Sequence, residues 1–341
     1  MSRQIEKVKK YTNGVLPDTV VPFSLSKENL GLVNVAAWSA KAVYASGTAH
    51  MKHIAQPEEV SKHYPTQHIE NINASFRDGT VKATRVQLFS AHKEGLPSSL
   101  LVVAIRGSTS KRRDWTINFD DIGKGTEGEG FLDSEDCKYK VHGGFLECAK
   151  AMVEKLTDAI SSVIAKAGIE STNGGIQLLF TGHSAGGAVA SLLYAHMMSK
   201  NPSALTDLSP KFTSIGCIVF GTPPVSNPAL GPPSEDSTFL SIINEGDPVP
   251  RIDKDYIESL LMIYLCTEPT VAMQWDLPQM LLNNAGTVLF MKDDEQDLCA
   301  VPDDVGQTKT RRVLETTIFG NPRAHKMDMY LWKLGLIKGS S

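Results

Sequence analysis

The segment Gly182-His183-Ser184-Ala185-Gly186 constrains the possible fold of this chain more than any other. It matches a Gly-x-Ser-x-Gly pattern, and the residues on either side of it suit that pattern. An apolar, strand-like run at 176–180 precedes it, and a helix-like run at 187–196 follows it. A strand, a sharp turn and a helix are the context in which such a serine is strained and exposed. The pattern predicts an α/β fold with Ser184 as a candidate nucleophile. The plainer alternative is a tight turn that carries an exposed serine.

A nucleophilic serine needs a base to take its proton, and the base needs an acid to orient it. In folds with this turn, the acid and the histidine follow the serine along the chain. Of the nine histidines, His196 and His325 come after Ser184. His196 lies on the helix that follows the turn, about 18 Å along its axis from Ser184. His325, in the loop-like segment 320–325, is therefore the candidate base.

Asp247 is the best placed of the acids between Ser184 and His325. It follows the strand-like run 239–243, and in open α/β sheets the active crevice lies at the carboxyl ends of the strands. Asp253 and Asp255 come later in the chain. We expect Asp247 to orient the histidine, although its position before a proline also suits an ordinary turn residue.

The tetrahedral intermediate of acyl transfer carries a negative oxygen that needs hydrogen-bond donors. One predicted donor is the backbone N–H of Ala185, directly after the nucleophile. The second is Ser108, which follows the buried strand-like run 101–105 and offers an N–H and a hydroxyl. Arg106 is interpreted as structural, because a buried arginine usually pairs with a carboxylate.

Several blocks of the sequence, in order over about residues 85–330, resemble the class 3 lipases, the fungal-type triacylglycerol lipase family. They are Val103–Ser108 with Asp114-Trp115, Val141–Phe145, Gly182–Gly187, Phe220–Val225 leading to Asp247–Arg251, and His325-x-Met327-x-x-Tyr330. The resemblance implies an α/β-hydrolase fold, with a mostly parallel central sheet, helices on both faces and a lid helix. It also implies that Ser184, Asp247 and His325 form a triad and that Ser108 and Ala185 form the oxyanion hole. The segment Pro224-Val225-Ser226-Asn227 departs from the Pro-Arg-Val-Gly-Asn that is frequent in the family.

The resemblance also implies a lid region at about residues 108–136. Trp115 and Phe119 are four residues apart there, so on a helix they would share one face. A mobile amphipathic helix with a basic start suits a lipid interface. An ordinary surface helix with Trp115 packed inward fits the pattern equally well.

The length of 341 residues and the 41% hydrophobic content suit one α/β domain over residues 1–341. A net charge of -4 predicts no nucleic-acid binding surface. Residues 1–10 lack the apolar core of a secretion signal, and the longest apolar runs are too short to span a bilayer. We therefore expect a cytoplasmic protein, secreted only if the sequence has been trimmed. The five scattered cysteines predict reduced thiols and no metal site.

The remaining patterns give a coarse element map. Helices are expected at 26–44 and 148–167 and in a mostly helical insertion at 257–284, and strands at 84–89, 100–105, 287–291 and 312–317, with a turn at 95–98.

The leading functional prediction is a serine carboxylester hydrolase that acts through an acyl-enzyme on a lipid or other apolar ester and needs no cofactor. A thioesterase or acyltransferase would use the same residues, so it stays an alternative. A lipase-like scaffold that binds a ligand without turnover is a third possibility. The sequence leaves the acyl length, the head group and the oligomeric state open.

Overall fold

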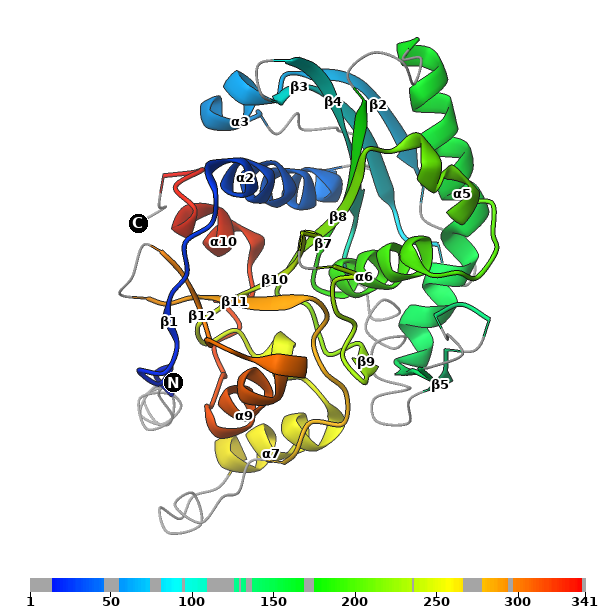
Figure 1. The fold of residues 1–341 in the computed structure, drawn as a ribbon. Helices are drawn as coiled ribbons and strands as arrows, with labels where there is room; N and C mark the ends of the chain where they lie inside the picture. The colour runs from blue at the N-terminus through cyan, green and yellow to red at the C-terminus, as the bar shows by residue number, and fades with distance from the viewer. Residues whose placement is uncertain are drawn as a thin grey trace.

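A nine-stranded sheet forms the centre of the molecule (Figure 1). The computed structural model describes residues 14–45, 55–73, 81–93, 96–108, 126–128, 130–132, 137–168, 175–234, 236–265, 278–293 and 297–338. The strands follow the order β1 (Val21–Pro22), β12 (Leu298–Ala300), β11 (Thr287–Met291), β10 (Phe239–Asn244), β8 (Ser214–Phe220), β7 (Ile176–His183), β4 (Leu96–Ile105), β3 (Thr84–Lys93) and β2 (Thr66–Ile72).

The neighbouring strands β4, β7, β8, β10 and β11 run parallel. Their sequences are nearly continuous apolar runs, as expected for strands that are buried on both faces. Parallel strands end at the same edge of a sheet. The segments after β4, β7 and β10 are therefore brought together there, although they are far apart in the sequence.

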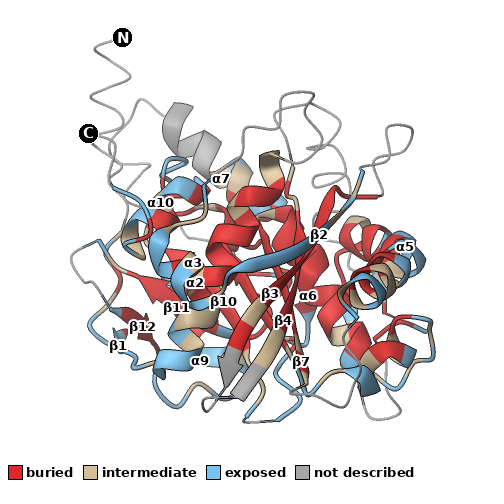
Figure 2. Ribbon diagram, turned by 90° about the horizontal axis from the view of Figure 1, so that it is seen from above, coloured by how far each residue is buried: buried red, intermediate tan, exposed pale blue. Residues whose placement is uncertain are grey.

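Helices cover both faces of this sheet (Figure 1). On one face lie α5 (Gly143–Ala167) and α6 (Ala185–Met198), and on the other lie α2 (Lys27–Ala42) and α10 (Met327–Lys333). Ser26 caps α2, because its hydroxyl accepts a hydrogen bond from the Asn29 N–H at 3.1 Å. Buried residues gather in the central strands and on the inner faces of the helices (Figure 2).

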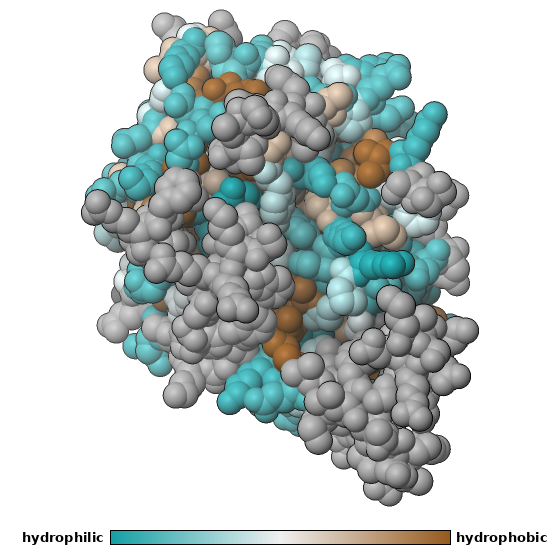
Figure 3. Space-filling view, turned by 180° about the vertical axis from the view of Figure 1, so that it is seen from behind, coloured by the Kyte–Doolittle hydropathy of each residue, from teal (hydrophilic) through white to brown (hydrophobic). Residues whose placement is uncertain are grey.

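Smaller elements complete the described part of the chain. They are α3 (Glu58–His63), α7 (Lys254–Leu265), α9 (Thr308–Thr316), the 3-10 helices η1 (Val43–Ala45), η2 (Thr206–Lys211), η3 (Val249–Arg251) and η4 (Val305–Gln307), and a small sheet of β5 (Thr126–Glu127), β6 (Lys140–Val141) and β9 (Ser226–Asn227). From behind, the described surface is mostly hydrophilic, with separate hydrophobic patches (Figure 3).

The strand predicted at 312–317 is wrong, because residues 308–316 form helix α9. The β-branched residues of this segment favoured a strand. However, Thr310, Val313 and Leu314 are the buried positions, and a spacing of three and four residues is that of a helix face.

Three other boundaries differ from the prediction. Helix α5 begins at Gly143 rather than at residue 148, and residues 96–98 belong to β4 rather than to a turn. The insertion at 257–284 is helical as far as Leu265, whereas residues 278–284 form no helix. Arg311 of α9 donates a side-chain hydrogen bond to the Met280 carbonyl, so this last stretch is held by tertiary contacts.

Most of the lid region at 108–136, including Trp115 and Phe119, lies outside the described residues. The lid therefore stays a prediction, as does the extent of a single domain over residues 1–341. None of the described helices combines the length and the apolar character needed to cross a bilayer.

Candidate active site

Ser184 occupies a strained turn between β7 and α6. Its φ is 59° and its ψ is -136°, a backbone conformation that residues other than glycine rarely adopt. The Ser184 N–H donates to the Phe220 carbonyl of β8 at 3.0 Å, which holds the turn against the neighbouring strand. Helix α6 begins at Ala185, so the N–H groups of its first turn have no acceptor within the helix and form its positive end. The turn predicted from the sequence is thus present.

The structure brings together the three side chains that the sequence singled out. His325, in the loop before α10, places Nε2 at 3.0 Å from Ser184 Oγ and Nδ1 at 3.0 Å from Asp247 Oδ2. His196 is elsewhere, since its two ring nitrogens lie 2.8 Å from the Phe131 carbonyl and from the Ser203 hydroxyl. The choice of His325 over His196 therefore agrees with the geometry.

The hydrogen bonds of His325 fix its tautomer. An ionised carboxylate only accepts hydrogen bonds, so His325 Nδ1 must carry the proton that faces Asp247. In the neutral ring, Nε2 then presents a lone pair to the Ser184 hydroxyl. This is the arrangement in which an imidazole can take a proton from a serine.

Asp247 is fully buried, and its carboxylate is held by two further donors. The Val249 N–H lies 2.9 Å from Oδ1, and the Tyr330 hydroxyl lies 2.6 Å from Oδ2. Burial, and then the charge of Asp247, raise the pKa of the Tyr330 phenol, which therefore stays protonated and donates. Asp253, the rejected alternative, instead pairs with the buried Arg251 at 2.7 Å.

Three residues of this site were not assigned a role from the sequence. Tyr330 supports Asp247, as above, and the Asn244 amide donates to the Ala324 carbonyl at 2.9 Å, next to His325. Gly221 has a φ of 53°, and a Cβ on it would lie 2.7 Å from Asp247 Oδ2 and 3.1 Å from His325 Nδ1. Its place directly after the buried strand β8 is the signal that would have found it.

The predicted oxyanion donors lie on both sides of Ser184. Ala185 is the next residue, and the loop after β4 approaches from the neighbouring strand. In that loop a Cβ on Gly107 would lie 3.2 Å from Ser184 Cβ, and the partly exposed Ser108 follows directly. The donor roles of Ser108 and Ala185 stay predictions.

Residues 102–256, a little under half of the chain, match the family model described as Lipase (class 3). This segment, which contains Ser184 and Asp247, is similar to the class 3 lipases. The fold of the chain is the α/β-hydrolase fold, and the protein is a serine ester hydrolase of the lipase and esterase type.

Solved structures similar to this chain include three fungal lipases. The lipase of Rhizopus microsporus var. chinensis is 18% identical over 91% of this chain and 93% of that one, with a TM-score of 0.49. The Rhizomucor miehei lipase propeptide complex is 15% identical over 95% and 89%, with a TM-score of 0.48. A triacylglycerol lipase from Penicillium expansum is 17% identical over 81% and 84%, with a TM-score of 0.47. No curated protein sequence matches the chain.

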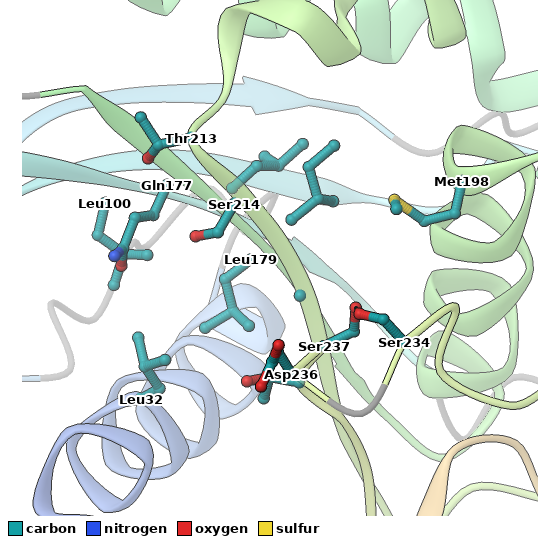
Figure 4. Close-up of a pocket in the computed structure, with 14 residues that line it drawn as sticks. Leu32, Leu100, Gln177, Leu179, Met198, Thr213, Ser214, Ser234, Asp236 and Ser237 are labelled. Carbon is teal, nitrogen blue, oxygen red and sulfur yellow. Dashed lines mark hydrogen bonds between the residues drawn. The ribbon is translucent and has the colours of Figure 1, made fainter.

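A cavity of about 280 Å³ lies away from Ser184 (Figure 4). Gln177 and Ser214, at the beginnings of β7 and β8, line it together with Leu32, Met198 and Asp236. Ser184 follows the opposite end of β7, so this cavity is separate from the candidate active site.

Proposed function

We propose that this protein hydrolyses lipid or other apolar carboxylic esters through an acyl-enzyme formed on Ser184. The observation that carries the proposal is the alignment of Ser184 Oγ, His325 and Asp247 by two hydrogen bonds of 3.0 Å. The buried carboxylate orients the ring and stabilises the imidazolium that forms during the reaction.

The proposed reaction has two matching halves. His325 Nε2 takes the hydroxyl proton as Ser184 Oγ attacks the ester carbonyl carbon, and the carbonyl electron pair moves onto oxygen. The backbone N–H of Ala185 and the donors of Ser108 stabilise this oxyanion, and one such donor contributes about 10²–10³ in kcat. The intermediate expels the alcohol, which receives the proton from Nε2. Water then repeats these steps on the acyl-enzyme and releases the acid.

The direct test is covalent labelling of Ser184. A fluorophosphonate should add to the peptide that contains Ser184, and the purified protein should hydrolyse short p-nitrophenyl esters. Matched oxyesters and thioesters in the same assay distinguish a carboxylesterase from a thioesterase, and an acyl-acceptor alcohol detects acyl transfer. If the folded protein neither takes the label nor hydrolyses any ester, the scaffold interpretation replaces the proposal.

Tyr330→Phe should lower kcat about tenfold and leave KM within about twofold, because it removes one charge-assisted hydrogen bond from Asp247 and keeps the ring. The matched control is Tyr194→Phe. Tyr194 is also a buried tyrosine, but its hydroxyl has no hydrogen-bond partner among the described residues. Steady-state kinetics on a soluble ester would show the difference. Equal kcat values for the two variants would contradict a role of Tyr330 in holding Asp247.

A further inference from the structure

His183, the last residue of β7, is buried beside the candidate catalytic groups. Its ring centroid lies 4.6 Å from that of His325. Its Nε2 lies 2.7 Å from the backbone carbonyl oxygen of His325, and its Nδ1 lies 3.0 Å from the Tyr44 hydroxyl. His183 therefore contacts the backbone of the proposed base while it directly precedes the proposed nucleophile.

The partners of His183 define the direction of both hydrogen bonds. A carbonyl oxygen only accepts, so Nε2 donates to His325. Nδ1 of the neutral ring is then an acceptor, and the Tyr44 hydroxyl is its donor. Burial, and then the nearby His325, lower the pKa of His183 well below its usual value, so the ring stays neutral near pH 7.

Tyr44 connects His183 to the loop after β4. Its hydroxyl lies against Gly107, and burial raises the pKa of the phenol, so the hydroxyl keeps its proton for His183. A Cβ on Gly107 would collide with the Tyr44 hydroxyl and would lie 2.5 Å from the His183 carbonyl oxygen. The close approach thus depends on glycine at the residue directly before Ser108.

The geometry points to a positioning role for Tyr44 and His183. We propose that these two side chains form a hydrogen-bonded bridge that fixes the loop of Ser108 and the backbone of His325 relative to Ser184. This inference rests on the proposed function. The bridge joins segments from η1, β4, β7 and the loop before α10, and a displacement of about 1 Å in such a constellation can cost about 10²-fold in rate.

A packing role and a positioning role make different demands on these side chains. Packing needs the volume of the two rings, whereas the bridge needs the Tyr44 hydroxyl and both nitrogens of His183. Tyr44→Phe and His183→Phe keep an aromatic ring and remove the hydrogen bonds. His183→Gln keeps an amide that can both donate and accept.

The first experiment measures kcat and KM of these variants on a soluble p-nitrophenyl ester. Tyr44→Phe should lower kcat about tenfold, and His183→Phe about a hundredfold, with KM changed less than about threefold. His183→Gln should recover part of the loss. The double variant Tyr44→Phe/His183→Phe should be no slower than His183→Phe, because members of one chain of hydrogen bonds are not additive. Tyr194→Phe serves again as the control and should keep its kcat.

The second experiment follows the bridge without turnover. Amide hydrogen exchange in residues 320–326 should be faster in Tyr44→Phe and His183→Phe than in the wild type and in Tyr194→Phe. Unchanged kcat and unchanged exchange in Tyr44→Phe, or single effects that multiply in the double variant, would overturn the bridge. If the wild type hydrolyses no ester and takes no fluorophosphonate, the proposed function fails instead. The exchange data still decide whether the bridge exists.

Discussion

Ser184→Ala is expected to lower the hydrolysis of short p-nitrophenyl esters by several orders of magnitude while the protein stays folded. Ser184 Oγ is the atom aligned with the lone pair of His325 Nε2, so its removal takes away the bond-forming group. The residual activity of the variant comes from direct attack by water, assisted by the oxyanion donors and by substrate binding. In well-studied triads this residual rate is about 10³–10⁴ times the uncatalysed rate.

The backbone at this position supplies the matched control. Ser184 has a strained backbone with a φ of 59°. Alanine at this position would have the same strain, whereas glycine adopts a positive φ without it. Ser184→Gly should therefore be as inactive as Ser184→Ala and have a higher Tm. This pair separates loss of chemistry from loss of fold. Most of the activity surviving in a cleanly folded Ser184→Ala protein would show that another residue is the nucleophile.

The parts of the site that could be predicted are those set by local sequence. The turn at Ser184 follows from five residues between an apolar strand and a helix, and Asp247 follows from its place after another strand. His325 came from chain order together with the exclusion of His196, which lies far along helix α6. In each case short-range rules of α/β architecture were enough, because parallel strands deliver their carboxyl ends to one edge.

The parts that could not be predicted depend on contacts between distant segments. The Tyr330 hydroxyl reaches Asp247 across a sequence separation of 83 residues, and the Tyr44 hydroxyl reaches His183 across 139. No local pattern distinguishes these tyrosines from others that pack in the core, such as Tyr194. The strand wrongly predicted at 312–317 has the same origin. The β-branched residues of this segment suit a strand locally, and the helix α9 is recognised only from which of its residues are buried against the rest of the protein.

His325→Ala is expected to lower kcat about as much as Ser184→Ala. Without the imidazole, the Ser184 hydroxyl loses its only hydrogen-bonded base among the described residues, and Asp247 has no ring to orient. Residues that act as one unit show losses that do not add, so His325→Ala combined with Ser184→Ala should be no slower than either change alone.

The matched control for His325→Ala is His196→Ala. His196 is also a histidine with two hydrogen-bonded ring nitrogens, and it stacks on Phe131 with ring centroids 3.9 Å apart. Its removal takes the closer of two hydrogen-bond partners from the buried Phe131 carbonyl and opens a cavity, so we expect a lower Tm, by a destabilisation of roughly 1–3 kcal/mol. Its kcat, measured well below that Tm, should stay within about threefold of the wild type. If His196→Ala abolished the activity of a folded protein and His325→Ala did not, the assignment of His325 as the base would be wrong. The proposed triad of Ser184, His325 and Asp247 would then be wrong as well.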